Sequence, residues 1–290
     1  MSEKKIVKES IEIKNIHNEI LRADIRFPET ENKSESESLK LPVVIFCHGF
    51  KGFKDWGCFP YLMERVAAAG NFAVSFNFSY NGTGENENDQ NDFARLELFA
   101  QNTFSRELDD LGSVIDFITE NKNNYNYDPQ NITLIGHSRG GGIAILKTAE
   151  DNRVKRLIVL ASVCNFDRYS DVLKKKWKET GFFEVLNSRT NQIMRLNYTL
   201  IEDIEKNRER LDIQKAISEI NVPALIIHGT QDITVDYSNA EDLYSRSNKE
   251  KTELVLIENT GHTFGAVHPY EGTTKALEEA ITIIENFLKK

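Results

Sequence analysis

One segment of the chain constrains its fold more than any other. Ile132–Gly142 reads ITLIGHSRGGG, in which a short apolar run leads directly into Gly136–Gly140 and a small, helix-compatible stretch follows. Strand, sharp turn and helix form the context that a G-x-S-x-G motif requires. Glycine at both ends of the turn lets strand and helix approach closely. The segment therefore predicts Ser138 as a nucleophile lifted off the end of a buried strand.

Further apolar runs of this kind predict the rest of a sheet. They cover Pro42–Cys47, Phe72–Phe78, Leu157–Leu160, Ala224–Ile227 and Leu254–Ile257. Such continuous runs are typical of strands that are buried on both faces. Helical patterns lie between most of them, at Tyr61–Ala69, Thr103–Thr119, Gly141–Ala149 and Thr273–Lys289. The alternation predicts an α/β fold, with a mostly parallel central sheet and helices on both faces.

The N-terminal part has a different pattern. Ile6–Lys14 and Glu19–Phe27 alternate apolar and polar residues, so we expect an antiparallel hairpin with its turn at Asn15–Asn18. This hairpin would add an antiparallel edge to the sheet. The polar segment Glu29–Ser38, which follows it, is expected to be a solvated loop.

One connection is too long for a simple crossover. It runs from Cys164 to Val222, and apolar residues recur at helical spacing in Tyr169–Trp177 and Ile193–Ile204. We therefore expect Asn165–Leu211 to be a helical insertion and Asp212–Ile220 to be a helix that returns to the sheet. The predicted domains are a core of residues 1–164 and 221–290 and a cap of residues 165–220.

A serine nucleophile needs hydrogen-bond donors for the oxyanion that forms when it attacks a carbonyl group. The segment Cys47–Gly52 (CHGFKG) directly follows a buried strand, which is the usual place for one donor. We predict that the backbone N–H groups of Phe50 and Arg139 form the oxyanion hole. His48 is expected to brace this loop, and His137 to serve packing and turn geometry.

The order nucleophile, acid, base predicts the partners of Ser138. Asp232 follows the strand Ala224–Ile227 in a tight turn and is the predicted acid, with Asp236 as the alternative. His262 follows the last strand and is the predicted base, because His268 precedes a proline and is more typical of a turn. His228 lies on a strand and is not expected to act as the base. The base would take the serine proton, and the acid would orient and stabilise the imidazolium.

Charge and cysteine usage exclude several classes of protein. Lys and Arg number 36 and Asp and Glu 45, a net charge of −9, so a nucleic-acid partner is not expected. No apolar run approaches the length of a membrane span, and none follows the lysines of the N-terminus. The 3 cysteines show no metal-binding spacing. We expect a cytoplasmic protein without a cofactor or metal, and a homodimer is compatible with these features.

Four short motifs together resemble the α/β-hydrolase superfamily over nearly the whole chain: HGFKG, GHSRG, HGTQD and GHTF. HGFKGFKDWG and the single insertion resemble bacterial feruloyl and cinnamoyl esterases and prolyl-oligopeptidase-type hydrolase domains. The resemblance implies an α/β-hydrolase fold and a serine carboxylesterase for small-molecule esters of small or aromatic acids, acting through an acyl-enzyme on Ser138. It also implies that Asn165–Leu211 forms a lid over Ser138.

Two other functions stay open at this point. The same three residues could serve a thioesterase or a small-substrate peptidase, and a non-catalytic binding member of the fold would retain them for no evident reason. The chain departs from the family pattern at Asn77–Asn102, a long loop rich in asparagine and acidic residues. This loop could line the site or be solvated.

Overall fold

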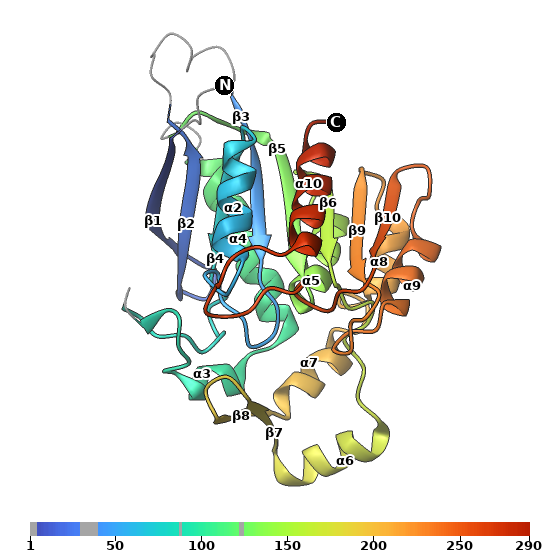
Figure 1. The fold of residues 1–290 in the computed structure, drawn as a ribbon. Helices are drawn as coiled ribbons and strands as arrows, with labels where there is room; N and C mark the ends of the chain where they lie inside the picture. Colours follow the sequence, from blue (N-terminus) through green and yellow to red (C-terminus); the bar gives the residue numbers. More distant parts are fainter. Residues whose placement is uncertain (1–4, 30–39, 87–88, 122–124) are drawn as a thin grey trace.

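A computed structural model describes residues 5–29, 40–86, 89–121 and 125–290 (Figure 1). Within these residues the main sheet has 8 strands in the order β1-β2-β4-β3-β5-β6-β9-β10. Nearly all of the loop predicted at Glu29–Ser38 lies outside the described residues.

The sheet is mostly parallel, as predicted. The parallel strands are β3 (Leu41–Cys47), β4 (Phe72–Phe76), β5 (Tyr127–His137), β6 (Val154–Leu160), β9 (Ala224–Gly229) and β10 (Thr252–Ile257). The N-terminal strands β1 (Ile6–Lys14) and β2 (Ile20–Pro28) pair antiparallel, and β2 joins β4 antiparallel. This arrangement confirms the α/β-hydrolase fold class with its antiparallel edge.

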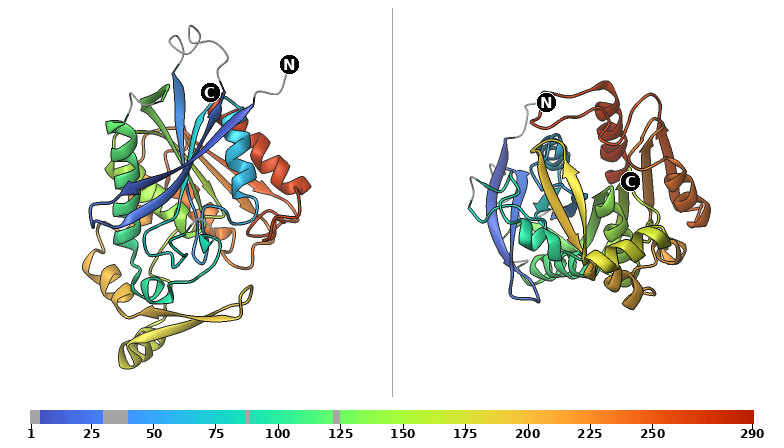
Figure 2. Two further views of the ribbon diagram at one scale, coloured as in Figure 1. Left: turned by 90° about the vertical axis from the view of Figure 1, so that its left-hand side faces the viewer. Right: turned by 90° about the horizontal axis from the view of Figure 1, so that it is seen from below.

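Helices cover both faces of the sheet (Figures 1 and 2). On one face lie α2 (Phe59–Ala68) and α10 (Lys275–Leu288). On the other lie α4 (Phe104–Glu120), α5 (Arg139–Glu150), α8 (Ile213–Glu219) and α9 (Ser238–Arg246). The Thr103 and Thr274 side chains cap α4 and α10 by accepting hydrogen bonds from the backbone N–H groups of Arg106 and Leu277. Both α4 and α10 therefore start where the sequence places a capping threonine.

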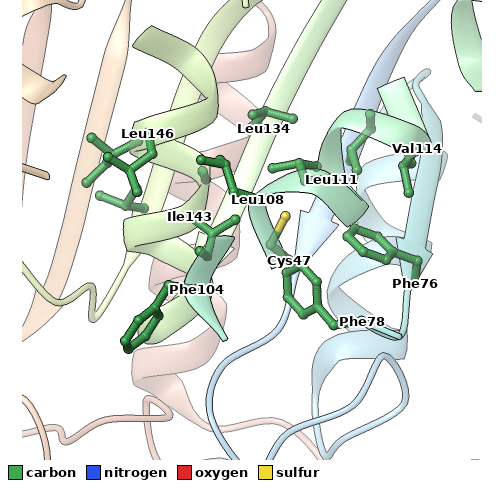
Figure 3. Close-up of a cluster of buried hydrophobic side chains, with 14 of the residues drawn as sticks. Cys47, Phe76, Phe78, Phe104, Leu108, Leu111, Val114, Leu134, Ile143 and Leu146 are labelled. Carbon is green, nitrogen blue, oxygen red and sulfur yellow. The ribbon is translucent and has the colours of Figure 1, made fainter. Parts of the chain in front are cut away.

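Two clusters of buried apolar side chains hold these layers together, one on each face of the sheet. Figure 3 shows part of the larger cluster, in which Leu108 and Leu111 of α4 meet Ile143 of α5. Cys47, at the end of β3, lies in the same cluster and is fully buried. This packing fixes the carboxyl ends of β3 and β5, the strands that lead to the two predicted oxyanion donors.

The connection between β6 and β9 contains both helices and a hairpin. It comprises α6 (Asp171–Thr180), β7 (Phe182–Asn187), β8 (Gln192–Asn197) and α7 (Thr199–Lys206), followed by α8 on the way back to the sheet. The prediction of a helix throughout Ile193–Ile204 is therefore wrong for its first half. Met194 and Leu196 are buried while Ile193 is exposed, an alternation with the strand period of two. Over so few residues, a strand and a helix share much of the same apolar pattern.

This hairpin lies on the side of the sheet where the parallel strands end (Figure 1). The Trp177 indole N–H of α6 donates to the backbone oxygen of Leu196 over 2.9 Å. Nζ of Lys51, in the predicted oxyanion loop, lies 3.2 Å from the backbone oxygen of Leu186 in β7. The helix α3 (Leu96–Gln101), in the long loop after β4, packs against β8. The insertion thus contacts both the oxyanion loop and the loop after β4.

Candidate active site

Ser138 stands between β5 and α5 in an unusual backbone conformation. Its φ is 57° and its ψ is −120°, outside the regions that residues with a side chain normally adopt. A Cβ at Gly136 would lie 2.3 Å from the backbone oxygen of Gly140, and one at Gly140 would lie 2.4 Å from that of Cys47. The tight turn therefore requires glycine at both positions.

The loop after β3 lies directly against this turn. A Cβ at Gly49 would come within 3.0 Å of the Ser138 Cβ. Among the described residues, the backbone N–H groups of Phe50 and Arg139 have no hydrogen-bond acceptor, and Arg139 is the first residue of α5. Unpaired N–H groups beside a serine, one of them at a helix N-terminus, can stabilise an anion.

His48 braces the loop that carries Phe50. Its Nδ1 donates to the backbone oxygen of Gly49 over 2.9 Å, and its Nε2 accepts from the N–H of Phe78 over 3.3 Å. Burial lowers the pKa of His48 to about 4, so the ring is neutral near pH 7. A neutral imidazole can make both of these bonds at once, one as a donor and one as an acceptor.

Asp232 lies in the turn after β9, and its side chain is fully buried. Oδ1 accepts hydrogen bonds from the N–H groups of Thr234 and Val235, both over 2.9 Å. Oδ2 lies 2.7 Å from Nδ1 of His262, in the loop after β10. Burial on its own would raise the pKa of this carboxyl. Hydrogen bonds from His228, His262 and Val235 outweigh that effect and hold the pKa well below its usual range.

Asp236, the alternative acid, is not brought to His262. Its Oδ1 accepts a hydrogen bond from the N–H of Ser238 over 2.9 Å at the start of α9, and its side chain faces solvent. His268, the other candidate base, accepts a hydrogen bond from the N–H of Gly57 and packs against Phe53. Of the candidates, the structure pairs Asp232 with His262.

His137, the residue before Ser138, contacts His262 and so connects the serine turn to the loop after β10. Nε2 of His137 lies 2.9 Å from the backbone oxygen of His262, and the two ring centroids are 4.7 Å apart. Within the described residues, the Ser138 hydroxyl makes no hydrogen bond to His262. Such a bond is often long before substrate binds. Because Asp232 occupies Nδ1 of His262, Nε2 is the ring nitrogen left for a proton transfer.

The sequence pointed to neither the ionic partner of Arg139 nor the second contact of Asp232. Nε of Arg139 lies 2.8 Å from Glu107 of α4, both side chains are buried, and the guanidinium lies over the Phe104 ring. His228 of β9 is fully buried, and its Nε2 lies 3.2 Å from Oδ2 of Asp232. The sequence did contain one indication that His228 is buried, because this residue directly continues the apolar run of β9.

The described residues contain no group of three His, Cys, Asp or Glu side chains arranged to hold a metal ion. None of the helices in the described part of the chain is both long and apolar enough to cross a bilayer.

Comparison with known proteins identifies the family. A family model with the description BD-FAE matches residues 95–246, more than half of the chain. The chain belongs to the BD-FAE family. Residues 95–246, which the family model matches, begin directly before α3, include the serine turn and the insertion, and end with α9.

Curated relatives of this BD-FAE member include esterases. Putative esterase/lipase 2 of Mycoplasma genitalium is 28% identical over 239 residues, which cover 74% of this chain and 80% of that protein. The uncharacterized peptidase YuxL of Bacillus subtilis is 25% identical over 57% of this chain, which spans only 23% of that protein. The family match and the first of these relatives place the chain among hydrolases of the esterase/lipase type.

Solved structures share the fold. Est1E from Butyrivibrio proteoclasticus, determined with ferulic acid bound, matches with a TM-score of 0.69 and 18% identity over 96% of this chain and 98% of that one. A hydrolase from Agrobacterium vitis matches with a TM-score of 0.72 and 19% identity over 98% of this chain and 100% of that one. At this identity, the likeness concerns the fold alone.

Proposed function

We propose that this hydrolase is a serine carboxylesterase that cleaves esters of small or aromatic acids through an acyl-enzyme on Ser138. The observation that carries the proposal is the 2.7 Å contact between Asp232 Oδ2 and His262 Nδ1. That pair lies in the loops after β9 and β10, at the sheet edge where β5 presents the serine turn. A buried carboxylate that orients an imidazole beside a serine is the arrangement that activates the hydroxyl.

In the first half of the reaction, Oγ of Ser138 attacks the ester carbonyl carbon while Nε2 of His262 takes the hydroxyl proton. The N–H groups of Phe50 and Arg139 bind the oxyanion of the tetrahedral intermediate. Asp232 keeps the imidazole oriented and stabilises its protonated form. His262 then gives its proton to the leaving alcohol as the C–O bond of the ester breaks.

The second half regenerates the enzyme. A water molecule attacks the acyl carbon of the acyl-enzyme as His262 takes one of its protons. The intermediate collapses, the bond between the acyl carbon and Oγ breaks, and His262 returns the proton to Ser138. The carboxylic acid leaves. Apart from the ester and the water molecule, these steps use groups of the chain itself.

Aromatic side chains next to the oxyanion loop support an aromatic or small acyl group. The ring of Phe50, which is half-buried, lies 5.5 Å from that of Phe99, and Phe99 lies 6.1 Å from Phe93. Phe99 and Phe93 are buried, so Phe50 is the ring of the three that a substrate can contact. Aromatic rings favour such offset or edge contacts with a further ring. The ferulic acid bound to Est1E, a protein of the same fold, is an aromatic acid.

The insertion Asn165–Leu211 forms the lid over the site in this proposal. Its support is the hydrogen bond from Lys51, next to Phe50, to the backbone oxygen of Leu186 in β7. A second bond runs from Nε2 of Gln192 in β8 to the backbone oxygen of Phe93 over 2.9 Å. The hairpin thereby contacts the two loops that carry the aromatic residues.

The test uses p-nitrophenyl acetate, methyl ferulate and a fluorophosphonate probe. We expect the native protein to hydrolyse both esters and to be labelled at Ser138. Ser138→Ala should lose labelling and at least about 10³-fold in kcat/KM while it keeps its fold. Absence of both turnover and labelling in the folded native protein would contradict the proposal.

A peptidase is the second candidate, because a relative bears the name of an uncharacterized peptidase. Aminoacyl p-nitroanilides and acyl-CoA substrates, assayed beside the esters, separate this function and a thioesterase from an esterase. A kcat/KM for either class above that for the esters would replace the esterase proposal with that function.

A further inference from the structure

His228 is a fully buried histidine that the proposed reaction does not use. It lies near the end of β9, four residues before Asp232. Its Nε2 is 2.8 Å from the backbone oxygen of Val235 and 3.2 Å from Oδ2 of Asp232. Because a carbonyl oxygen can only accept, Nε2 carries a hydrogen and donates it to Val235, and Oδ2 of Asp232 is a second acceptor 3.2 Å from the same nitrogen.

The other nitrogen of His228 fixes the charge of the ring. Nδ1 is buried and has no partner among the described residues. A proton on Nδ1 would be a buried donor without an acceptor, which is costly. The ring is therefore a neutral imidazole that presents one hydrogen to the turn.

That hydrogen completes the surroundings of the Asp232 carboxylate. The backbone N–H groups of Thr234 and Val235 donate to Oδ1, Nδ1 of His262 lies 2.7 Å from Oδ2, and Nε2 of His228 lies 3.2 Å from the same oxygen. A carboxylate offers about four acceptor positions, so this one is saturated. Oδ2 is shared between the proposed base and His228.

We propose that His228 is a positioning residue that clamps Oδ2 of Asp232 and limits the negative charge that this oxygen presents to His262. The inference rests on the proposed serine-esterase function and concerns the same site. Donation from His228 competes with donation from His262 for one oxygen. The imidazolium of His262 is thereby less favoured, and more of this base stays neutral and able to accept the serine proton.

Several other titratable groups face His228. Asp232 and Asp236 lie on the turn that follows β9, and His137 approaches from the end of β5. Burial lowers the pKa of His137 to about 3, so His137 is neutral wherever an esterase would be assayed. Asp236 is exposed and screened by solvent. Asp232 is the group through which His228 can act on His262.

The experiment compares three substitutions in the full chain. His228→Leu removes the donor, and His228→Asn keeps a polar group that is too short to reach Oδ2. His228→Gln places an N–H near the position of Nε2. In ¹³C-histidine-labelled protein, the titration of the His262 Cε1–H signal is followed by NMR and assigned with His262→Gln. The kcat/KM for p-nitrophenyl acetate is measured across the same pH range.

We expect the His262 titration midpoint, and with it the acidic limb of kcat/KM, to move to higher pH by about one unit in His228→Leu and His228→Asn. The kcat/KM at pH 7 should fall about tenfold, the equivalent of one net hydrogen bond. His228→Gln should restore both values most of the way. Thermal unfolding of each variant identifies losses of fold, and His228→Asn carries the test if His228→Leu does not fold.

An unchanged His262 titration in folded His228→Leu or His228→Asn would overturn the inference and leave His228 as a packing residue. Failure of the proposed function looks different. The native protein would then lack turnover and fluorophosphonate labelling, while the NMR titration would still report whether His228 acts on His262.

Discussion

Nε2 of His137 lies 2.9 Å from the backbone oxygen of His262, so the residue beside Ser138 holds the loop that carries the proposed base. Because the acceptor is a carbonyl, Nε2 of His137 carries a hydrogen. Burial and the neighbouring His262 together lower the pKa of His137 to about 3. His137 is therefore a neutral donor and cannot serve as the general base near pH 7.

Replacing His137 with leucine should release the loop of the proposed base. His137→Leu keeps a similar volume but loses the bond to the His262 oxygen. We expect kcat/KM for p-nitrophenyl acetate to fall about tenfold, chiefly through kcat, because the base loses its position. Steady-state kinetics measure the effect, and His17→Gln, on the β1–β2 turn, is the control. Unchanged kcat in a folded variant would show that the bond does not position His262.

The two candidate acids separate cleanly by substitution. Asp232→Asn should lower kcat by about 10⁴-fold, because an amide favours the wrong tautomer of His262. Asp236→Asn should leave kcat within about twofold, since the exposed Asp236 side chain accepts the N–H of Ser238 at the start of α9 and does not contact His262. Single-turnover and steady-state assays compare the two. Equal losses in both variants would contradict the assignment of Asp232.

The local features of this site were predictable because they depend on short sequence context. A buried parallel strand leaves a continuous apolar run, and the turn of Ser138 needs glycine on both sides. The bonds from His137 to His262 and from His228 to Asp232 were not predictable. They join residues on different strands and loops, and which side chains meet there is decided by the packing of the sheet.

The insertion was harder to interpret for a different reason. The structure places it between β6 and β9, but Ile193–Leu196 forms part of a strand where a helix was expected. Isolated hairpins are stabilised by what they pack against, here α3 and Trp177 of α6, rather than by their own propensity. These packing partners cannot be recognised from the six residues of the strand alone.

His48 should make the protein less stable in acid. Burial lowers the pKa of His48 from 6.5 to about 4 in the folded protein, so the unfolded chain binds a proton more readily. The preference of the folded protein for neutral His48 therefore does not lower the free energy of unfolding above pH 6.5. The free energy of unfolding falls as the pH drops from 6.5 toward 4, because the unfolded chain takes up the proton first. His48→Gln should be less stable at pH 7, and its deficit should shrink by about 3 kcal/mol at pH 4.

Urea unfolding of both proteins from pH 4 to pH 7 measures this change. Asp110, whose pKa burial raises to about 6, acts with the opposite sign in the same range. The difference between native protein and variant cancels that contribution, because both retain Asp110. A deficit independent of pH would show that His48 does not stay neutral in the folded protein.

Lys51 links the proposed lid to the oxyanion loop through its bond to the Leu186 oxygen. Lys51→Met keeps the length of the side chain but loses this donor, so the β7–β8 hairpin should open more often. We expect KM for methyl ferulate to rise about threefold to fivefold, since one partly exposed charged hydrogen bond contributes about 1 kcal/mol. The kcat for p-nitrophenyl acetate, a small substrate that needs little of the lid, should stay within about twofold.

Lys249→Met, near Tyr244 on α9, is the matched control and should change neither value. Equal effects on both substrates would instead place the role of Lys51 in the oxyanion hole, because a displaced Phe50 N–H would slow every ester alike.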